Sequence, residues 1–436
     1  MNATSTSYPR QLLQSIQSLL NPRPFARLTG SARRWTTWRL LMAALLMGWD
    51  ESPALRQRWR QTREFLRRLW PTARLGHCYR GFIDALQARS PAMLSELGRQ
   101  FRLRLQQLPA TMRLVDGWLA FAVDGTRANC PRSAANEKAF PRAGRQKSPP
   151  QVGLVSLRHL ASGMLWDFRV AAAVVSERLH LLAMLAEVPP NSLLVMDAGF
   201  VGYDLLSQIC TSGQHFLLRV GANVRLLRKL GWGRCHGQDL VYLWPDKARR
   251  HQQPPLVLRL IVLHDGRRPV YLVTDVLDRR RLSGSAASRL YRRRWSIEVM
   301  HRDLKQTLGR SAMRSRQPQR ALCEWQWAVA SLWVLQWLAW TALREAGQTE
   351  ASPSMAAALS CVRLAVTQLW RPVRNGALRR ILGQCLADRY VRHSAKTRRR
   401  WPAKKKDRPP GRPKIHLATT EQIQQAKELE HETTAA

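Results

Sequence analysis

The stretch from Tyr291 to Lys305 reads Tyr-Arg-Arg-Arg-Trp-Ser-Ile-Glu-Val-Met-His-Arg-Asp-Leu-Lys. In a helix, where each residue advances by about 100°, Arg294, Glu298 and Lys305 fall within roughly 60° of Tyr291. Four apolar residues fall on an adjacent stripe, about 40 to 80° further round: Leu290, Ile297, Leu304 and Leu308. The stretch therefore predicts a helix that buries one edge and presents one acid, two bases and a phenol beside it.

Glu298 has two interpretations at this point. It can pair with Arg294 or Arg302, each four residues away, as charged residues on helix surfaces often do. It can also belong to a site that holds a metal ion and an anionic polymer, for which an aligned acid and bases are needed. The rest of the chain decides between them.

The composition points to a folded protein with a polyanionic partner. The chain has 436 residues, of which 45% are hydrophobic, enough for two or three domains with a sizeable core. Its formal net charge of +42 would oppose compaction by self-repulsion unless a polyanion neutralised it. Nucleic acid is the first candidate partner and an anionic membrane surface the second. The basic residues are spread along the chain, which favours a long nucleic-acid footprint.

Cysteine usage and hydropathy predict a cytoplasmic protein that does not span a membrane. The seven cysteines form no Cys-x-x-Cys pair, which argues against a zinc knuckle or a disulfide framework and for reduced thiols. The N-terminus lacks a basic segment followed by an apolar one. The apolar run Ala328–Leu343 is interrupted by Ser331, Gln336 and Thr341, so we expect a buried helix there.

Residues 1–112 are predicted to form a helical domain. Apolar residues recur there at steps of three and four, Arg and Gln fill the other faces, and Pro71 and Pro91 interrupt the pattern. A small basic helical domain often docks on DNA, so this domain is expected to bind DNA ends. The alternative is a helical domain that packs against the rest of the protein and does not bind DNA.

The pattern changes after residue 112, and residues 113–220 predict an α/β unit. Apolar runs and alternating segments indicate strands, and amphipathic segments indicate helices. The expected order is strand, strand, strand, helix, strand, helix, strand: Trp118–Val123, Gln151–His159, Leu165–Val170, Glu177–Glu187, Ser192–Met196, Tyr203–Cys210 and His215–Val220.

The second half of the chain is expected to interrupt and then complete this unit. Residues 221–284 predict a β-rich insertion, and residues 285–345 rejoin the α/β domain. Residues 346–390 are predicted to be helical. Residues 391–436 are expected to be a basic tail. Val391–Lys414 holds eleven Lys or Arg against one Asp and is expected to be disordered until bound, and the last twenty residues are expected to be frayed or weakly helical.

Two predicted strands each end in an aspartate followed closely by glycine. Asp124 and Asp197 stand where sites gather in an α/β sheet, although an Asp at such a place can simply cap a turn. Together with Glu298 they would repel one another unless a cation lay between them. An all-carboxylate set suits Mg²⁺ or Mn²⁺, and two such ions about 3.5–4 Å apart can clamp a phosphodiester. These residues predict metal-assisted phosphoryl transfer on nucleic acid.

The chain resembles the Asp-Asp-Glu transposases of bacterial insertion sequences, in the insertion-sequence-four family. That family's signature is Tyr, two residues, Arg, three residues, Glu, six residues, Lys, and Tyr291, Arg294, Glu298 and Lys305 have this spacing. Two segments match the contexts of the family's two aspartates: Asp124-Gly125-Thr126 and Asp197-Ala198-Gly199-Phe200. The resemblance is specific over about residues 118–310 and loose at both ends.

The resemblance implies a ribonuclease H-like catalytic core in which two Mg²⁺ or Mn²⁺ ions are held by Asp124, Asp197 and Glu298. It implies cut-and-paste transposition by a homodimer on double-stranded DNA, at terminal inverted repeats and target DNA. Phosphates would be gripped by Tyr291, Arg294 and Lys305. Trp232 and Trp244 lie where similar enzymes hold a flipped base, but two core tryptophans are the simpler interpretation.

Two rival functions fit part of this sequence. A catalytically silent relative would bind DNA through its positive charge and would not cut it. The presence of all three carboxylates argues against this function. A metal-dependent nuclease without strand transfer would need neither the helical N-terminal domain nor the insertion. We therefore expect a transposase.

Overall fold

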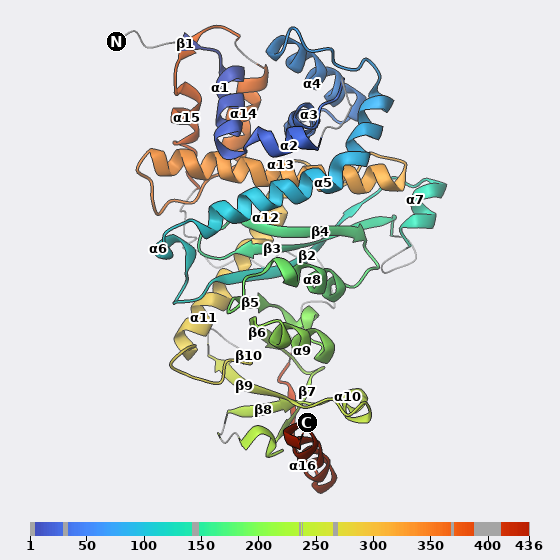
Figure 1. Cartoon of the computed structure of the whole chain (residues 1–436), viewed down its shortest axis with the longest axis vertical. Coiled ribbons are helices and arrows are strands. Elements are labelled where there is room, and N and C mark those ends of the chain that lie inside the picture. The colour runs from blue at the N-terminus through green and yellow to red at the C-terminus, as the bar shows by residue number, and fades with distance from the viewer. Residues whose placement is uncertain are drawn as a thin grey trace, which may run out of the picture.

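A computed structural model of the chain shows a helical layer packed on one part of a long β-sheet, with the sheet extending away from the helices (Figure 1). The structure describes residues 5–28, 34–141, 148–234, 237, 239–264, 269–367, 370–387 and 411–435.

Five strands form the middle and one end of the sheet. Their order is β6-β5-β2-β3-β4, with β2 antiparallel to β3, β3 antiparallel to β4, and β2, β5 and β6 mutually parallel. Their bounds are β2 Ala120–Asn129, β3 Gln151–His159, β4 Leu165–Ala172, β5 Leu193–Met196 and β6 His215–Val220. The predicted strands and their order are confirmed. The two intervening helices are also confirmed, as α8 (Glu177–Met184, followed by a 3-10 turn) and α9 (Tyr203–Thr211).

The strands of residues 221–284 continue the same sheet. β10 pairs antiparallel with β6, and β9, β8 and β7 follow outward from it. Their bounds are β7 Arg225–Arg228, β8 Leu240–Leu243, β9 Leu256–Leu263 and β10 Val270–Thr274. The region is β-rich as predicted, and its strands share hydrogen bonds with the α/β unit.

The C-terminal residues 411–435 form a strand and a helix, so the prediction of disorder is wrong for the strand, while the helix agrees with the weak helicity expected of the last twenty residues. β12 (Lys414–Leu417) pairs parallel with β7 and ends the ten-stranded sheet. α16 (Thr420–Ala435) follows and buries Ala426 and Leu429 against Tyr242 and Trp244. The charge count gave no sign of this, because a strand added at a sheet edge is held mainly by backbone hydrogen bonds. Most of the basic run, residues 391–410, lies outside the described residues.

The helices before and after the sheet form a single layer around α13 (Pro318–Glu345). N-terminal helices α3 and α5 pack on α13 together with α14 and α15, and β1 (Ser5–Thr6) pairs with β11 (Val373–Arg374). The helices of this layer are α1 Tyr8–Leu19, α2 Pro22–Arg27, α3 Thr37–Trp49, α4 Leu55–Leu69, α5 Tyr79–Gln106, α14 Met355–Thr367 and α15 Ala377–Leu382. Three further short helices are α6 Ala110–Arg113, α7 Ala134–Ala139 and α10 Asp246–Arg250. The expectation that Pro91 interrupts the helical pattern is wrong, because α5 continues through it.

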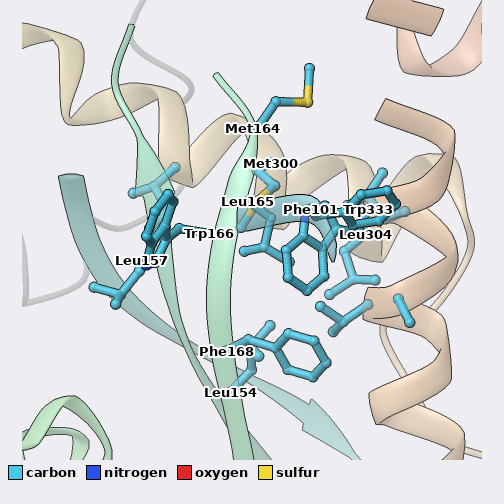
Figure 2. Packing of buried hydrophobic residues seen from close by; sticks show 14 of the residues in the cluster. Phe101, Leu154, Leu157, Met164, Leu165, Trp166, Phe168, Met300, Leu304 and Trp333 are labelled. Carbon is cyan, nitrogen blue, oxygen red and sulfur yellow. The ribbon is translucent and has the colours of Figure 1, made fainter. Parts of the chain in front are cut away.

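The helical layer rests on β3 and β4 through large apolar side chains. Figure 2 shows Phe101, Leu304 and Trp333 close together beside these strands. Phe101 and Phe168 contact Trp333, with ring centroids 5.1 and 6.1 Å apart. This packing fixes the helix that carries Glu298 against the sheet that carries both aspartates.

α13 is buried along most of its length, as predicted for the run Ala328–Leu343. Its contact with α3 is close: a Cβ at Gly48 would lie 1.9 Å from the Oγ atom of Ser331. Among the helices that the structure describes, none is both long and apolar enough to cross a membrane.

A buried arginine ties the end of α3 to the segment that follows Glu298. Arg310 is 3% exposed, and its Nη2 atom lies 2.8 to 3.2 Å from the carbonyl oxygens of Met47, Gly48 and Asp50. The last carbonyls of a helix have no partner within the helix, so the guanidinium satisfies groups that would otherwise be buried without one.

Candidate active site

The stretch Tyr291–Lys305 is helical, but it is not one regular helix. α11 (Gly284–Arg293) and α12 (Trp295–Arg302) meet at Arg294, which keeps right-handed helical angles, φ −51° and ψ −35°. A π turn, Asp303–Thr307, follows and is closed by the N–H of Leu308, which donates to the Asp303 carbonyl at 2.9 Å. Such turns occur frequently at functional sites. Apolar periodicity predicted the helix and could not show its widened last turn.

The predicted apolar edge of this helix is buried. Its four members are each 1% exposed or less: Leu290, Ile297, Leu304 and Leu308. Because these side chains fix the rotation of the helix, the adjacent stripe faces the sheet edge where Asp124 lies.

The predicted polar stripe is linked by direct contacts. The Nη2 atom of Arg294 donates to Glu298 Oε1 at 2.8 Å, and the Arg294 guanidinium carbon lies 5.7 Å from the centre of the Tyr291 ring. Lys305 is half-buried; burial lowers the pKa of its ammonium and the nearby Asp124 opposes that change. Glu298 therefore makes the ion pair of the simpler interpretation while standing in the proposed site.

Asp124 and Asp197 occupy matching places on neighbouring strands. The parallel pairing of β2 with β5 ends near Ala122 and Val195, and each aspartate lies two residues further on. Neighbouring strands are about 4.8 Å apart, so the two carboxylates come close together. The prediction that the first strand ends before Asp124 is wrong, because β2 remains paired with β3 as far as Asn129.

Each aspartate also makes a local turn contact. Oδ1 of Asp124 accepts from the N–H of Gly125, and Oδ1 of Asp197 accepts from the N–H of Gly199, both at 2.9 Å. The turn-capping role that the sequence allowed is thus present at Asp197. These bonds use one oxygen of each carboxylate.

The three carboxylates share one electrostatic environment. Burial raises the pKa of Asp124 to about 7, with further contributions from Asp197 and Glu298 and opposition from Arg294. Ionisation of Asp124 is therefore unfavourable in the folded chain unless a positive charge lies beside it. The donors are all carboxylate oxygens, which fits a hard divalent cation.

Metal binding would require rearrangement of the side chains. Within the described ranges, no three His, Cys, Asp or Glu side chains already converge closely enough to hold a metal ion. Glu298 is engaged by Arg294 at 2.8 Å, so it would have to leave this partner to reach an ion. The residue types fit a divalent cation, and in this structure Glu298 is paired with Arg294.

The sequence favours a packing or helix-surface role for His301, with assistance to proton transfer as the alternative. It is 6% exposed, its Nε2 atom is 2.9 Å from Ser156 Oγ, and its Nδ1 atom is 3.8 Å from Asp124 Oδ2. Burial, with Lys305 and Arg158, lowers the pKa of His301 to about 3, so the ring is neutral at physiological pH. The ring packs beside the Asp124 carboxylate. Its spacing, four residues before Lys305 on the predicted helix, was the feature of the sequence that could have indicated a place in the site.

Two further residues lie near the site: Glu177, to which the sequence analysis gave no role, and Trp295, which it expected to pack. Glu177, at the start of α8, lies over Gly125. Trp295 is 62% exposed beside Arg294, so its large apolar surface is not packed in the core. Nothing in the apolar periodicity singles out Glu177, because it precedes the first buried residue of a short helix.

The two tryptophans considered for base stacking lie in the small apolar cluster beneath α16. Trp244 is 4% exposed, and its indole N–H donates to the Gln253 carbonyl at 2.8 Å. Trp232 is half-buried against the same cluster. These positions favour core packing for Trp244, and base stacking by either residue stays a prediction.

The central part of the chain matches a known family. Residues 119–334 match the model described as "Transposase DDE domain", a range that contains both aspartates and the Tyr-Arg-Glu-Lys residues. The chain is 31% identical over 216 residues to "Transposase InsG for insertion sequence element IS4" of Escherichia coli (strain K12), covering 47% of this chain and 48% of that protein.

Two other similarities are weaker. "Putative transposase InsZ" of the same strain is 30% identical over 147 residues, covering 32% of this chain and 49% of that protein. The chain thus spans about half the length of the curated relatives it matches. A solved structure, "Cryo-EM structure of piggyBac transposase synaptic complex with hairpin DNA (SNHP)", has 11% identity and a TM-score of 0.41, covering 88% of this chain and 86% of that chain.

Proposed function

We propose that this chain, an IS4-related protein whose residues 119–334 form a transposase DDE domain, is a transposase of a bacterial insertion sequence that cuts and joins DNA at element ends. The observation that carries the proposal is the placement of Asp124 and Asp197 at matching positions just beyond the paired residues of β2 and β5, with Glu298 close enough to affect the ionisation of Asp124. The net charge of +42 supports DNA as the polyanion.

We also propose that the five strands β4-β3-β2-β5-β6 form a ribonuclease H-like core. Its support is the arrangement of three antiparallel strands followed by two parallel ones, with the carboxylates where β2 and β5 separate. The proposed organisation has three regions: a DNA-binding helical region at residues 1–112, a catalytic unit at residues 113–220 and 285–345, and an insertion at residues 221–284. It also includes a homodimer that binds paired DNA ends.

Asp124, Asp197 and Glu298 would hold the divalent cations, Mg²⁺ or Mn²⁺. When bound, two such ions activate the attacking oxygen and stabilise the leaving one. The chain's own part is to place the carboxylates: the strand register sets both aspartates, and buried His301 supports Asp124. Arg294 holds Glu298 beside them until the cation competes for it.

Tyr291, Arg294 and Lys305 would contact the DNA backbone near the scissile phosphate. Arg294 offers a planar fork for two phosphate oxygens, and Lys305 offers a point charge. The Nε and Nη1 atoms of Arg294 are buried without a hydrogen-bond partner in the described structure, so donors remain for a ligand once the site opens.

The test is cleavage of the DNA that flanks this protein's own gene, with Mg²⁺ or Mn²⁺, by wild type and Glu298→Gln. The substitution keeps the size of the side chain and removes its charge. Wild-type cutting at the boundaries of an inverted repeat, with a variant that binds and does not cut, is the expected result. Joining of the cut ends to a second DNA distinguishes a transposase from a nuclease. Equal cutting by both proteins would mean that Glu298 is only a surface ion-pair partner.

Lys305→Ala is expected to weaken DNA binding more than metal binding. Losing one phosphate contact should reduce DNA affinity by about tenfold at low salt and lower the salt slope by about one. Fluorescence anisotropy with end DNA in EDTA, set beside Mn²⁺ titration without DNA, measures the two effects. Lys247→Ala is the matched control, since Lys247 is 75% exposed and far along the chain from the signature. Normal end binding with lost Mn²⁺ affinity would count against this role.

A further inference from the structure

The first residues of α8 touch both segments that carry the aspartates. A Cβ at Gly125 would lie 2.2 Å from Oε1 and 2.9 Å from Oε2 of Glu177, so this carboxylate rests directly on the strand next to Asp124. Arg178 donates from Nε to the carbonyl of Gly199 at 3.3 Å, beside Asp197. Two successive side chains thus bridge the strand of one aspartate and the turn of the other.

The local sequence holds Glu177 at this point. Ser176 caps α8 by accepting from the N–H of Arg178 at 3.3 Å, which makes Glu177 the first helical residue. The start of a helix favours a negative side chain. Gly125 leaves room that any other residue would fill, because even a Cβ there would meet the Glu177 carboxylate.

The Glu177 carboxylate has no hydrogen bond or ion pair with any residue that the structure describes. It is half-buried, and burial raises its pKa; the positive charge of Arg127 opposes this rise, and the negative charge of Asp197 adds a smaller one. A half-buried acid without a bonded partner, beside a second carboxylate, gains from a cation that binds between them.

We propose that Glu177 is a fourth carboxylate of the metal site, approaching from the face of β2 that Gly125 occupies. This rests on the proposed function. Side chains alternate along a strand, so Asp124 and Gly125 face opposite sides. The paired region of β2 and β5 ends near Ala122 and Val195, so donors from both faces can reach an ion at that point.

The test compares Mn²⁺ affinity of the full chain by isothermal titration in four proteins: wild type, Glu177→Gln, Gly125→Ala and the Gly125→Ala/Glu177→Ala double variant. Glu177→Gln is expected to weaken Mn²⁺ binding by about tenfold. Gly125→Ala is expected to do the same by displacing the flexible end of Glu177, at little cost to the fold. The double variant should bind Mn²⁺ as weakly as a single variant and no more weakly, because both changes remove the same ligand.

Controls separate this inference from the proposed function. Glu137→Gln should leave Mn²⁺ affinity unchanged, since Glu137 pairs with Arg132 on the surface helix α7. Raising Mn²⁺ should restore most DNA cleavage to Glu177→Gln and none to Glu298→Gln. If Glu177→Gln binds Mn²⁺ like wild type while Asp124→Asn does not bind it, Glu177 is no ligand and the proposed function stands. If wild type itself binds no Mn²⁺ and cuts no DNA, both fail.

Discussion

An Asp124→Asn protein is expected to leave element ends uncut and, without metal, to be more stable than wild type at neutral pH. Asparagine keeps the shape of the side chain but is a poor ligand for a hard cation, so cleavage should fall by at least about a thousandfold. The stability gain follows because burial and two neighbouring carboxylates make the ionised Asp124 costly in the folded chain.

The sign and pH range of this gain follow from the pKa of Asp124, which rises from 3.8 to about 7 on folding. Below pH 4 the carboxyl is protonated in both states and the two proteins should be equally stable. Between pH 4 and 7 only the unfolded wild type ionises, so its stability falls by about 1.4 kcal/mol per pH unit relative to the variant. Above pH 7 the difference levels off at no more than about 4 kcal/mol.

Urea unfolding in EDTA at pH 4, 6 and 8 measures this difference. Asp204→Asn is the control, because the Asp204 side chain is 71% exposed and should give no such pH dependence. Added Mn²⁺ should narrow the gap by stabilising only wild type. A variant that is less stable than wild type at pH 8 in EDTA would contradict the described electrostatics.

Arg310→Met is expected to cost about 3 kcal/mol of unfolding free energy, the second large effect. The substitution keeps much of the apolar stem but leaves the carbonyls of Met47, Gly48 and Asp50 buried without their donor. Arg310 is itself costly to bury, since burial lowers its pKa to about 9, and this offsets part of the loss. Thermal unfolding and urea titration measure the change.

The position of Arg310 also predicts a loss of activity below the unfolding temperature. It follows directly after the segment that holds Glu298 and Lys305, so a loosened α3 contact should disturb that segment. Arg316→Met is the matched control, because Arg316 is exposed nearby. If the Arg310→Met and Arg316→Met proteins both unfold like wild type, the hydrogen bonds from Arg310 to the end of α3 do not stabilise the fold.

The sequence predicted the elements of the α/β unit and the matching positions of its two aspartates because both depend on local rules. Alternating apolar residues mark β3 and β4, and an aspartate after each parallel strand marks one sheet edge. The ion pair between Arg294 and Glu298 was foreseen for the same reason, since four-residue spacing brings helical side chains together.

Contacts between distant segments could not be predicted in this way. Glu177 reaches Gly125 only because α8 crosses the sheet, and no periodicity records that crossing. The pairing of β12 with β7 joins residues nearly 190 positions apart through backbone atoms that every residue has. The π turn after α12 changes the helix by one residue, which is too small a signal for an apolar pattern to show.

The helical layer has a consequence for how the protein is made. α3, which is buried along nearly its whole length, packs on α13, and the two are separated by roughly 270 residues of chain. At about 5–20 residues per second, a ribosome needs on the order of 15 to 50 seconds to make that separation. Throughout this interval the apolar surface of α3 lacks its partner, so the nascent chain is expected to be a client for chaperones that shield apolar segments during translation.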